Sequence, residues 1–272
     1  MRGTSRNSLT AAEERVEPLL GTLDSGTALA TGEELFAVAR LLDASGSLRR
    51  ALTDPSRPSQ DKADLADRLL AGKVSDTTRA LVSGLARERW SEARDLGDAA
   101  EHLGVVALLA GAERDGVLDS VEDELFRFGR VVDGDRSLAQ ALTDRSASPE
   151  RKAGLVERLL AGKAQPHTLA LVKQAAGYPR GRALTAALDA FGRIAARRRE
   201  RMVATVTAAV PLTENQRARL TSVLERVYGT GIWLNVDVDP ELLGGLRIQV
   251  GDEVIDASVL SRLDDARRRL AG

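Results

Sequence analysis

From about residue 12 to residue 200, apolar side chains recur at the three- and four-residue spacing of amphipathic helices. Leu125, Phe128 and Val132 form one such stripe. Ser148-Pro149-Glu150 supplies an N-cap hydroxyl, a proline at the first helical position and a first-turn acid, which together predict a helix start. The first 200 residues are therefore predicted to be helical throughout.

Beyond residue 200 the pattern changes to the alternation expected of strands. Val203 to Val210 is rich in β-branched residues, and in residues 232–238 apolar and polar side chains alternate. Between these segments Thr213 and Gln216 have the spacing of a capping box, which predicts a helix from there to about Tyr228. This region is predicted to be a small α/β domain.

The last 30 residues predict a hairpin and a closing helix. Leu246, Ile248 and Val250 alternate with polar residues, and Gly251-Asp252 is suited to a turn into residues 253–255. The apolar residues of the expected closing helix are Val259, Leu263, Ala266 and Leu270. We expect this helix to fold back over the hairpin.

The helical region contains an internal repeat. Residues 33–82 align without gaps to residues 123–172 at an offset of 90, with 25 of the 50 positions identical. Because 90 residues is far longer than the repeats of common helical solenoids, the pattern indicates two copies of a whole small domain of five or six helices each. A long helix around residues 91–113 is expected to join them.

The predicted fold is mainly α, with two homologous helical bundles in tandem followed by a small α/β domain. We place the first bundle at residues 1–100, the second at 101–201 and the C-terminal domain at 202–272. Each is long enough to bury its own core.

Composition excludes several classes of function. The chain has 39 basic and 40 acidic residues, a net charge of -1 and no cysteine, so it has neither a global field for nucleic acid nor thiolate metal sites. The longest apolar run, Leu103–Ala112, is about half of the ~20 residues needed to cross a bilayer. We expect a soluble chain that reaches a membrane only through other proteins.

No catalytic, cofactor or metal site is predicted. Gly72-Lys73 and Gly162-Lys163 lack the earlier glycine and the following Ser or Thr of a phosphate loop, and suit helix ends instead. His102 and His167 are the only histidines, and without cysteine they could form a zinc site only if carboxylates joined them across domains. We therefore expect structural histidines, on the surface or in a core. The candidate acidic pairs, which splay around helices, are Glu13-Glu14, Glu122-Asp123 and Asp264-Asp265.

The basic run Arg197–Arg201 leaves one alternative open. Its charge complements the C-terminal dipole of the preceding helix, but it could also bind phosphate, nucleic acid or an acidic helix. The alternative function is therefore a nucleic-acid-binding or regulatory adaptor that uses this run, and an enzyme with dispersed carboxylates is a third possibility.

Residues 243–259, Leu-Gly-Gly-Leu-Arg-Ile-Gln-Val-Gly-Asp-Glu-Val-Ile-Asp-Ala-Ser-Val, and the following Arg262-Leu263 carry a resemblance to a known family. The run resembles the C-terminal signature of the delta subunit of F-type ATP synthases, whose mitochondrial counterpart is the oligomycin-sensitivity-conferring protein. The resemblance covers about residues 100–272. The first bundle resembles the extra domain of long, actinobacterial-type delta chains.

The resemblance implies a non-catalytic peripheral-stalk, or stator, subunit of a proton-translocating F-type ATP synthase. Its implied partners are the alpha and beta subunits of the catalytic head and the b-type stalk subunit, with no nucleic acid and no cofactor. It would lie peripherally on the cytoplasmic face of the cell membrane, joined to the membrane sector through the stalk and resisting rotor torque.

One departure limits what the resemblance carries over. The family's Arg-Tyr-Ala opening of its first helix is absent, and residues 101–110 stand there instead. Individual head-contact residues are therefore not assigned. We expect the second bundle to dock on the head, because it directly precedes the C-terminal domain, and the first bundle to brace the stalk.

Overall fold

The structure is a computed structural model that describes residues 1, 3–199, 202–228, 231–240, 242, 245–250 and 253–256. The chain divides into two compact units, Met1–Ala196 and Arg197–Gly272, and each is described by itself. The first unit is helical, and the second contains a mixed sheet. The predicted fold class is confirmed.

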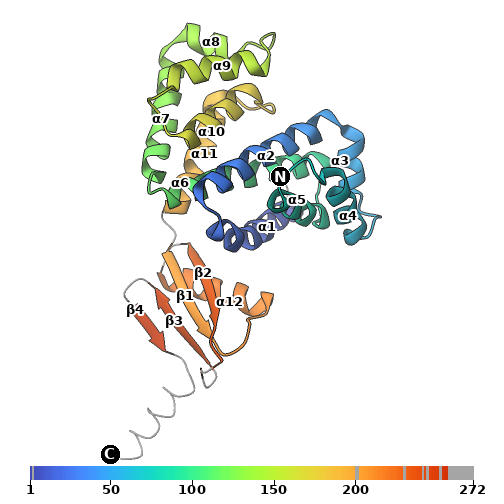
Figure 1. Cartoon of the computed structure of the whole chain (residues 1–272), viewed down its shortest axis with the longest axis vertical. Helices are drawn as coiled ribbons and strands as arrows, with labels where there is room; N and C mark the ends of the chain where they lie inside the picture. The colour runs from blue at the N-terminus through green and yellow to red at the C-terminus, as the bar shows by residue number, and fades with distance from the viewer. Residues whose placement is uncertain are drawn as a thin grey trace, which may run out of the picture. The chain divides into compact units, whose positions relative to one another are not determined.

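The helices of the first unit follow one another with short connections (Figure 1). They are α1 (Gly3–Thr22), α2 (Ser25–Ala44), α3 (Gly46–Thr53), α4 (Ser59–Leu70), α5 (Asp76–Arg87), α6 (Ala93–Arg114), α7 (Leu118–Gly134), α8 (Arg136–Thr143), α9 (Pro149–Leu160), α10 (Pro166–Gly177) and α11 (Leu184–Arg199).

The internal repeat is visible in the helix boundaries. The bounds of α3, α4 and α5 become those of α8, α9 and α10 when 90 is added to each residue number. We call α1–α5 the first repeat and α7–α11 the second repeat. At the same offset α6 corresponds both to α1, which opens the first repeat, and to α11, which closes the second. Helix α6 is therefore both the closing helix of the first repeat and the opening helix of the second.

Equivalent side chains make equivalent tertiary contacts in the two repeats. In the first, the Glu34 carboxylate accepts hydrogen bonds from the Ser75 backbone N–H (3.0 Å) and the Thr78 hydroxyl (2.5 Å), at the start of α5. In the second, Glu124 accepts from the Gln165 N–H (2.9 Å) and the Thr168 hydroxyl (2.5 Å), at the start of α10. These bonds satisfy N–H groups that a helix start leaves free.

The predicted helix ends are confirmed. The Ser148 hydroxyl accepts a hydrogen bond from the Arg151 N–H at the start of α9. Gly72 and Gly162 have φ of 69° and 68°, the left-handed conformation that glycine adopts without steric cost. Each glycine follows the last residues of a helix, so neither belongs to a phosphate loop.

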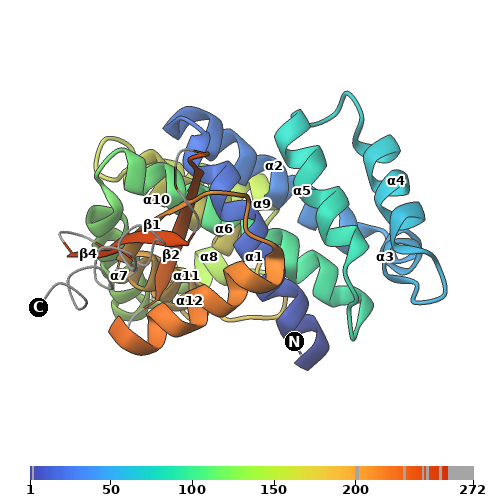
Figure 2. The ribbon, with the colours of Figure 1, turned by 90° about the horizontal axis from the view of Figure 1, so that it is seen from below.

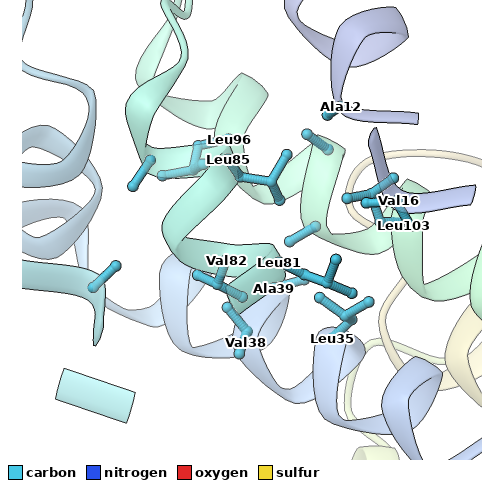
Figure 3. Packing of buried hydrophobic residues seen from close by; sticks show 14 of the residues in the cluster. Ala12, Val16, Leu35, Val38, Ala39, Leu81, Val82, Leu85, Leu96 and Leu103 are labelled. Carbon is cyan, nitrogen blue, oxygen red and sulfur yellow. The ribbon is translucent and has the colours of Figure 1, made fainter. Parts of the chain in front are cut away.

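Helix α6 is buried along nearly its whole length because it serves two cores. Its Leu96, Ala99 and Leu103 belong to a cluster with α1, α2 and α5 (Figure 3). Its Leu108 and Leu109 belong to a second cluster, formed mainly by α7, α10 and α11. The predicted boundary at residue 100 lies inside this helix, and the division into bundles 1–100 and 101–201 stays a prediction.

The second unit contains a four-stranded sheet of order β2-β1-β3-β4. The strands are β1 (Met202–Ala208), β2 (Ile232–Val238), β3 (Leu246–Val250) and β4 (Glu253–Asp256). β1 pairs in parallel with β2 and antiparallel with β3, and β3 pairs antiparallel with β4, which confirms the hairpin. Helix α12 (Glu214–Tyr228) lies along one face (Figures 1 and 2), where Leu224 packs on the strands.

The capping box at the start of α12 is confirmed in both directions. The Gln216 side-chain oxygen accepts from the Thr213 N–H at 2.9 Å, and the Thr213 hydroxyl accepts from the Gln216 N–H at 3.3 Å. The predicted closing helix at residues 259–270 and the Gly251-Asp252 turn lie outside the described residues.

Candidate interaction surfaces

Within the described residues no three His, Cys, Asp or Glu side chains gather in a way that could hold a metal ion. In the same part of the chain no helix is long and apolar enough to cross a membrane. The remaining candidates are clusters of polar side chains and hollows in the surface.

A serine, an aspartate and a histidine meet where α2, α6 and α10 come together. The Ser25 hydroxyl donates to the Asp115 carboxylate (2.5 Å) and lies 3.3 Å from Nε2 of His167. In a nucleophilic triad the imidazole stands between serine and carboxylate, whereas here the hydroxyl does. The cluster therefore ties helix ends together and is not arranged to activate the serine.

Burial lowers the pKa of His167, and the negative charge of Asp115 opposes this effect only in part. The imidazole is thus favoured in its neutral form. The other histidine, His102 on α6, contacts the Glu13 carboxylate on α1. Each histidine predicted to be structural thus bonds to a side chain of another helix.

The first repeat packs on the shared helix through a close approach of α2 and α6. A Cβ added to Gly104 would stand 2.7 Å from two ring carbons of Phe36 and 3.0 Å from the Gly32 carbonyl oxygen. A Cβ on Gly32 would stand 2.8 Å from the Gly104 carbonyl oxygen. Such distances leave no room for a side chain, so the glycines allow the two backbones to touch.

A network of ion pairs around two buried side chains, Arg180 and Glu101, connects the second repeat to α2 and α6. Arg180, between α10 and α11, pairs with Asp43 of α2 and with Asp98 of α6 (2.7 Å), and its side chain is only 7% exposed. Arg182 pairs with Glu101 of α6, whose side chain is 4% exposed. A loop of the second repeat therefore holds a helix of the first repeat and the shared helix together.

Arg180 has a φ of 50°, which is uncommon for a residue with a side chain. The neighbouring Arg40 lies 4.6 Å from the centre of the Tyr178 ring and donates to the Gln174 side chain at 3.1 Å. Gln174 in turn donates to Glu101 at 3.2 Å. These contacts line one side of a hollow of about 360 Å³ between α2, α9 and α10.

The second unit has a larger and more apolar hollow of about 610 Å³. It lies at the end of β1 and beside α12, where Val210, Leu212, Leu220 and Val223 line it. Val210 and Val223 are exposed. A surface of this kind suits an apolar protein segment better than a polar metabolite.

The predicted basic run is only partly available to a ligand. Arg197, Arg198 and Arg199 form the last turn of α11, as expected for charges that complement the helix dipole. Arg198 is buried, whereas Arg197 and Arg199 are exposed. Arg201 lies outside the described residues, and so does the acidic pair Asp264-Asp265.

The sequence did not identify Arg180, Glu101 or Phe126 as residues of interest. The network of Arg180 joins residues more than 80 positions apart, and no local pattern marks it. Phe126 aligns with Phe36 in the repeat, but the sequence around the two is alike, and only the structure shows that one is exposed and the other buried.

Comparison with known proteins gives full-length relatives. The sequence model of the family described as "ATP synthase delta (OSCP) subunit" matches residues 105–270. A protein of Streptomyces griseus named ATP synthase subunit delta is 50% identical over 272 residues, covering all of both chains. Proteins of the same name from Beutenbergia cavernae and Streptomyces coelicolor are also 50% identical and cover all of this chain and at least 98% of their own.

A chain of the Toxoplasma gondii mitochondrial ATP synthase hexamer is 22% identical and covers 62% of this chain, with a TM-score of 0.26, too low to compare folds. The relatives from actinobacteria include the first repeat, which the family model leaves unmatched. The resemblance seen in residues 243–259 therefore extends to the whole sequence, and the chain belongs to the ATP synthase delta (OSCP) subunit family.

Proposed function

We propose that this chain is a non-catalytic peripheral-stalk subunit of a proton-translocating F-type ATP synthase. It joins the catalytic head to the b-type stalk and resists the torque of the rotor. The observation that carries this proposal is the identity of 50% over the full length of proteins named ATP synthase subunit delta. The alpha and beta subunits of the head and the b-type subunit are its proposed partners.

The helical unit has the properties that a torque-bearing link needs. A rotor that turns inside the head would carry the head with it unless a stiff connection opposed the rotation. The repeats share α6, on which α2 packs through paired glycines, and the ion pairs of Arg180 bridge the two repeats, so bending between them would break several contacts together. Stiffness, and not bond chemistry, is the proposed activity.

The proposed role involves no catalysis, and the cluster of Ser25, Asp115 and His167 is not arranged for it. The Ser25 hydroxyl is directed to Asp115 and not to a general base. The chain would lie on the cytoplasmic face of the membrane and reach it only through its partners. Proton transfer itself would belong to the membrane-spanning subunits.

The test is a strain that lacks this chain and is complemented with the wild-type gene. We expect the chain to co-purify with tagged alpha subunit, beta subunit and the b-type subunit. Inverted membrane vesicles without the chain should lose ATP-driven proton pumping, while the released heads still hydrolyse ATP. Full pumping in its absence would refute the proposal.

We further propose that the second repeat contacts the head and the first repeat braces the stalk. Because α6 contributes to both cores, deleting one repeat would damage the core of the other. The two contacts are therefore tested by cross-linking in the full chain. Photo-crosslinkers on exposed positions of α4 should reach the b-type subunit, and those on α9 should reach alpha. The reverse pattern would exchange the two assignments.

A further inference from the structure

Three residues on the exposed side of α7 are identical to three on α2 at the repeat offset of 90. They occupy positions i, i+4 and i+7 and so form one stripe along each helix. The equivalent pairs are Phe36 and Phe126, Arg40 and Arg130, and Asp43 and Asp133.

On α2 this stripe is covered by α6, by α10 and by the loop between α10 and α11. Phe36 is 2% exposed and its ring lies on Gly104 of α6. Arg40 contacts the Tyr178 ring and the Gln174 side chain beyond the first repeat, and Asp43 accepts from Arg180. All three side chains thus join the first repeat to the rest of the helical unit.

On α7 the same three side chains face solvent. Phe126 is 63% exposed, and Arg130 and Asp133 are exposed as well. Among the described residues neither Arg130 nor Asp133 has a hydrogen bond or ion pair. A stripe that forms a helix interface in one repeat is therefore open in the other.

We propose that Phe126, Arg130 and Asp133 form a docking stripe for an α-helix of another subunit of the ATP synthase. The contacts of the equivalent stripe on α2, which α6, α10 and the loop after α10 make, indicate what the partner presents. It has glycine or alanine opposite Phe126, an aromatic ring or hydrogen-bond acceptor opposite Arg130, and a basic side chain opposite Asp133. This inference rests on the proposed function, since the partner is taken from that assembly.

The opposite side of α7 supplies a matched control. Val131 is 55% exposed, and its equivalent on α2, Leu41, is 46% exposed, so this position faces solvent in both repeats. Gly129 lies beside the docking stripe, and its equivalent, Ala39, is fully buried. A Cβ added to Gly129 would meet nothing within 4 Å, so a side chain fits there.

The natural absence of cysteine allows a direct test by thiol labelling of the full chain. Gly129→Cys and Val131→Cys are each labelled with a maleimide, in the free chain and in complexes purified through tagged alpha subunit. In the free chain both thiols should react at similar rates. In the complex the thiol at 129 should react at least about ten-fold more slowly, because interface cores exclude solvent, and the thiol at 131 should change less than about two-fold.

Phe126→Ala, added to the Gly129→Cys chain, should restore labelling in the complex by removing the apolar anchor of the contact. It should leave the melting temperature of the free chain unchanged, because Phe126 is mostly exposed. Protection that survives this substitution would contradict the role given to Phe126.

The remaining outcomes separate this inference from the proposed function. Equal labelling at 129 in the free chain and in a complex that contains the chain would overturn the docking stripe and leave the stator proposal intact. If the thiol at 129 were protected in the free chain and this chain sedimented as a dimer, the stripe would bind a second copy of the chain, and the proposed docking of another subunit would be overturned. Absence of the chain from the complex would overturn both.

Discussion

The contact between α2 and α6 depends on Gly104, and replacing this residue with alanine should destabilise the helical unit. Alanine is the better helix former, and in a free helix the change would gain about 0.5–1 kcal/mol. Here the new methyl group would lie 2.7 Å from the Phe36 ring and 3.0 Å from the Gly32 carbonyl oxygen. Since one neighbour is backbone and the other is a buried ring, neither can move away cheaply.

Overpacking of this kind costs about 1–3 kcal/mol, even after local relaxation. The net expectation for Gly104→Ala is a loss of about 1–2 kcal/mol of unfolding free energy, which lowers the melting temperature by about 2–8 °C for a unit of this size. Urea and thermal unfolding followed by far-UV circular dichroism report on the helical unit, which holds most of the helix.

Gly84→Ala is the matched control. Gly84 lies inside α5, and a Cβ there would meet nothing within 4 Å, so the same substitution should stabilise by about 0.5–1 kcal/mol. The two variants are thus expected to shift stability in opposite directions. If Gly104→Ala unfolded at the same or higher urea concentration than the wild type, the close packing of α2 on α6 would be wrong.

Three further substitutions test other contacts of the helical unit. Arg180→Ala should cost about 1.5–3 kcal/mol, measured by urea unfolding, because Asp43 and Asp98 lose their charged hydrogen bonds, while Glu101 keeps Arg182. Glu34→Gln should cost about 1 kcal/mol at pH 7, because a neutral amide accepts more weakly than a carboxylate, and thermal unfolding should show this difference fading in acid. The melting temperature of the wild type should fall as the pH drops below 6.5, and His167→Asn should make this fall smaller.

The sign of each pH effect follows from the pKa shifts. Partial burial raises the pKa of Glu34, but hydrogen bonds from Ser75 and Thr78 outweigh it and hold the pKa below its ordinary 4.5. Its contribution is therefore present above pH 4.5 and lost as pH falls through the lowered value. His167 also has a lowered pKa, so the unfolded chain binds the proton more readily and stability falls below pH 6.5.

Each of these substitutions has its own contradicting result. Arg127→Ala is the control for Arg180→Ala, because it removes an exposed ion pair with Asp123 and should cost no more than about 0.5 kcal/mol. If both substitutions cost the same, the ion pairs of Arg180 would not stabilise the helical unit as proposed. A deficit of Glu34→Gln that persisted unchanged at pH 3 would exclude the carboxylate as its cause. A wild-type melting temperature independent of pH between 5 and 7 would contradict the neutral buried state of His167.

Local features of the fold were predictable from the sequence because they depend on neighbouring residues. The cap of Ser148, the left-handed Gly72 and the capping box of Thr213 were each read from a few adjacent positions, and each is present. The repeat was predictable for a similar reason. Its offset of 90 also recurs in contacts, since Glu34 and Glu124 cap equivalent helices.

Contacts between distant segments were not predictable in this way. Phe36 and Phe126 have the same local sequence pattern, yet one is buried and the other is exposed. The difference comes from α6 and the loop around Arg180, which cover α2 and not α7. Likewise, the alternation in β1 indicated a strand but could not show that it lies between β2 and β3.

The shared helix explains why two copies of one domain act here as a single body. In an ordinary tandem array a linker separates two complete cores, and bending at the linker costs little. Here α6 closes the first repeat and opens the second, so rotation of one repeat against the other would pull the same helix out of one of its two cores. The ion pairs of Arg180 would break in the same movement, leaving this buried guanidinium without its carboxylate partners. Duplication with a shared element therefore lengthens the adaptor without adding a hinge between its repeats, which is the property that a link under torque requires.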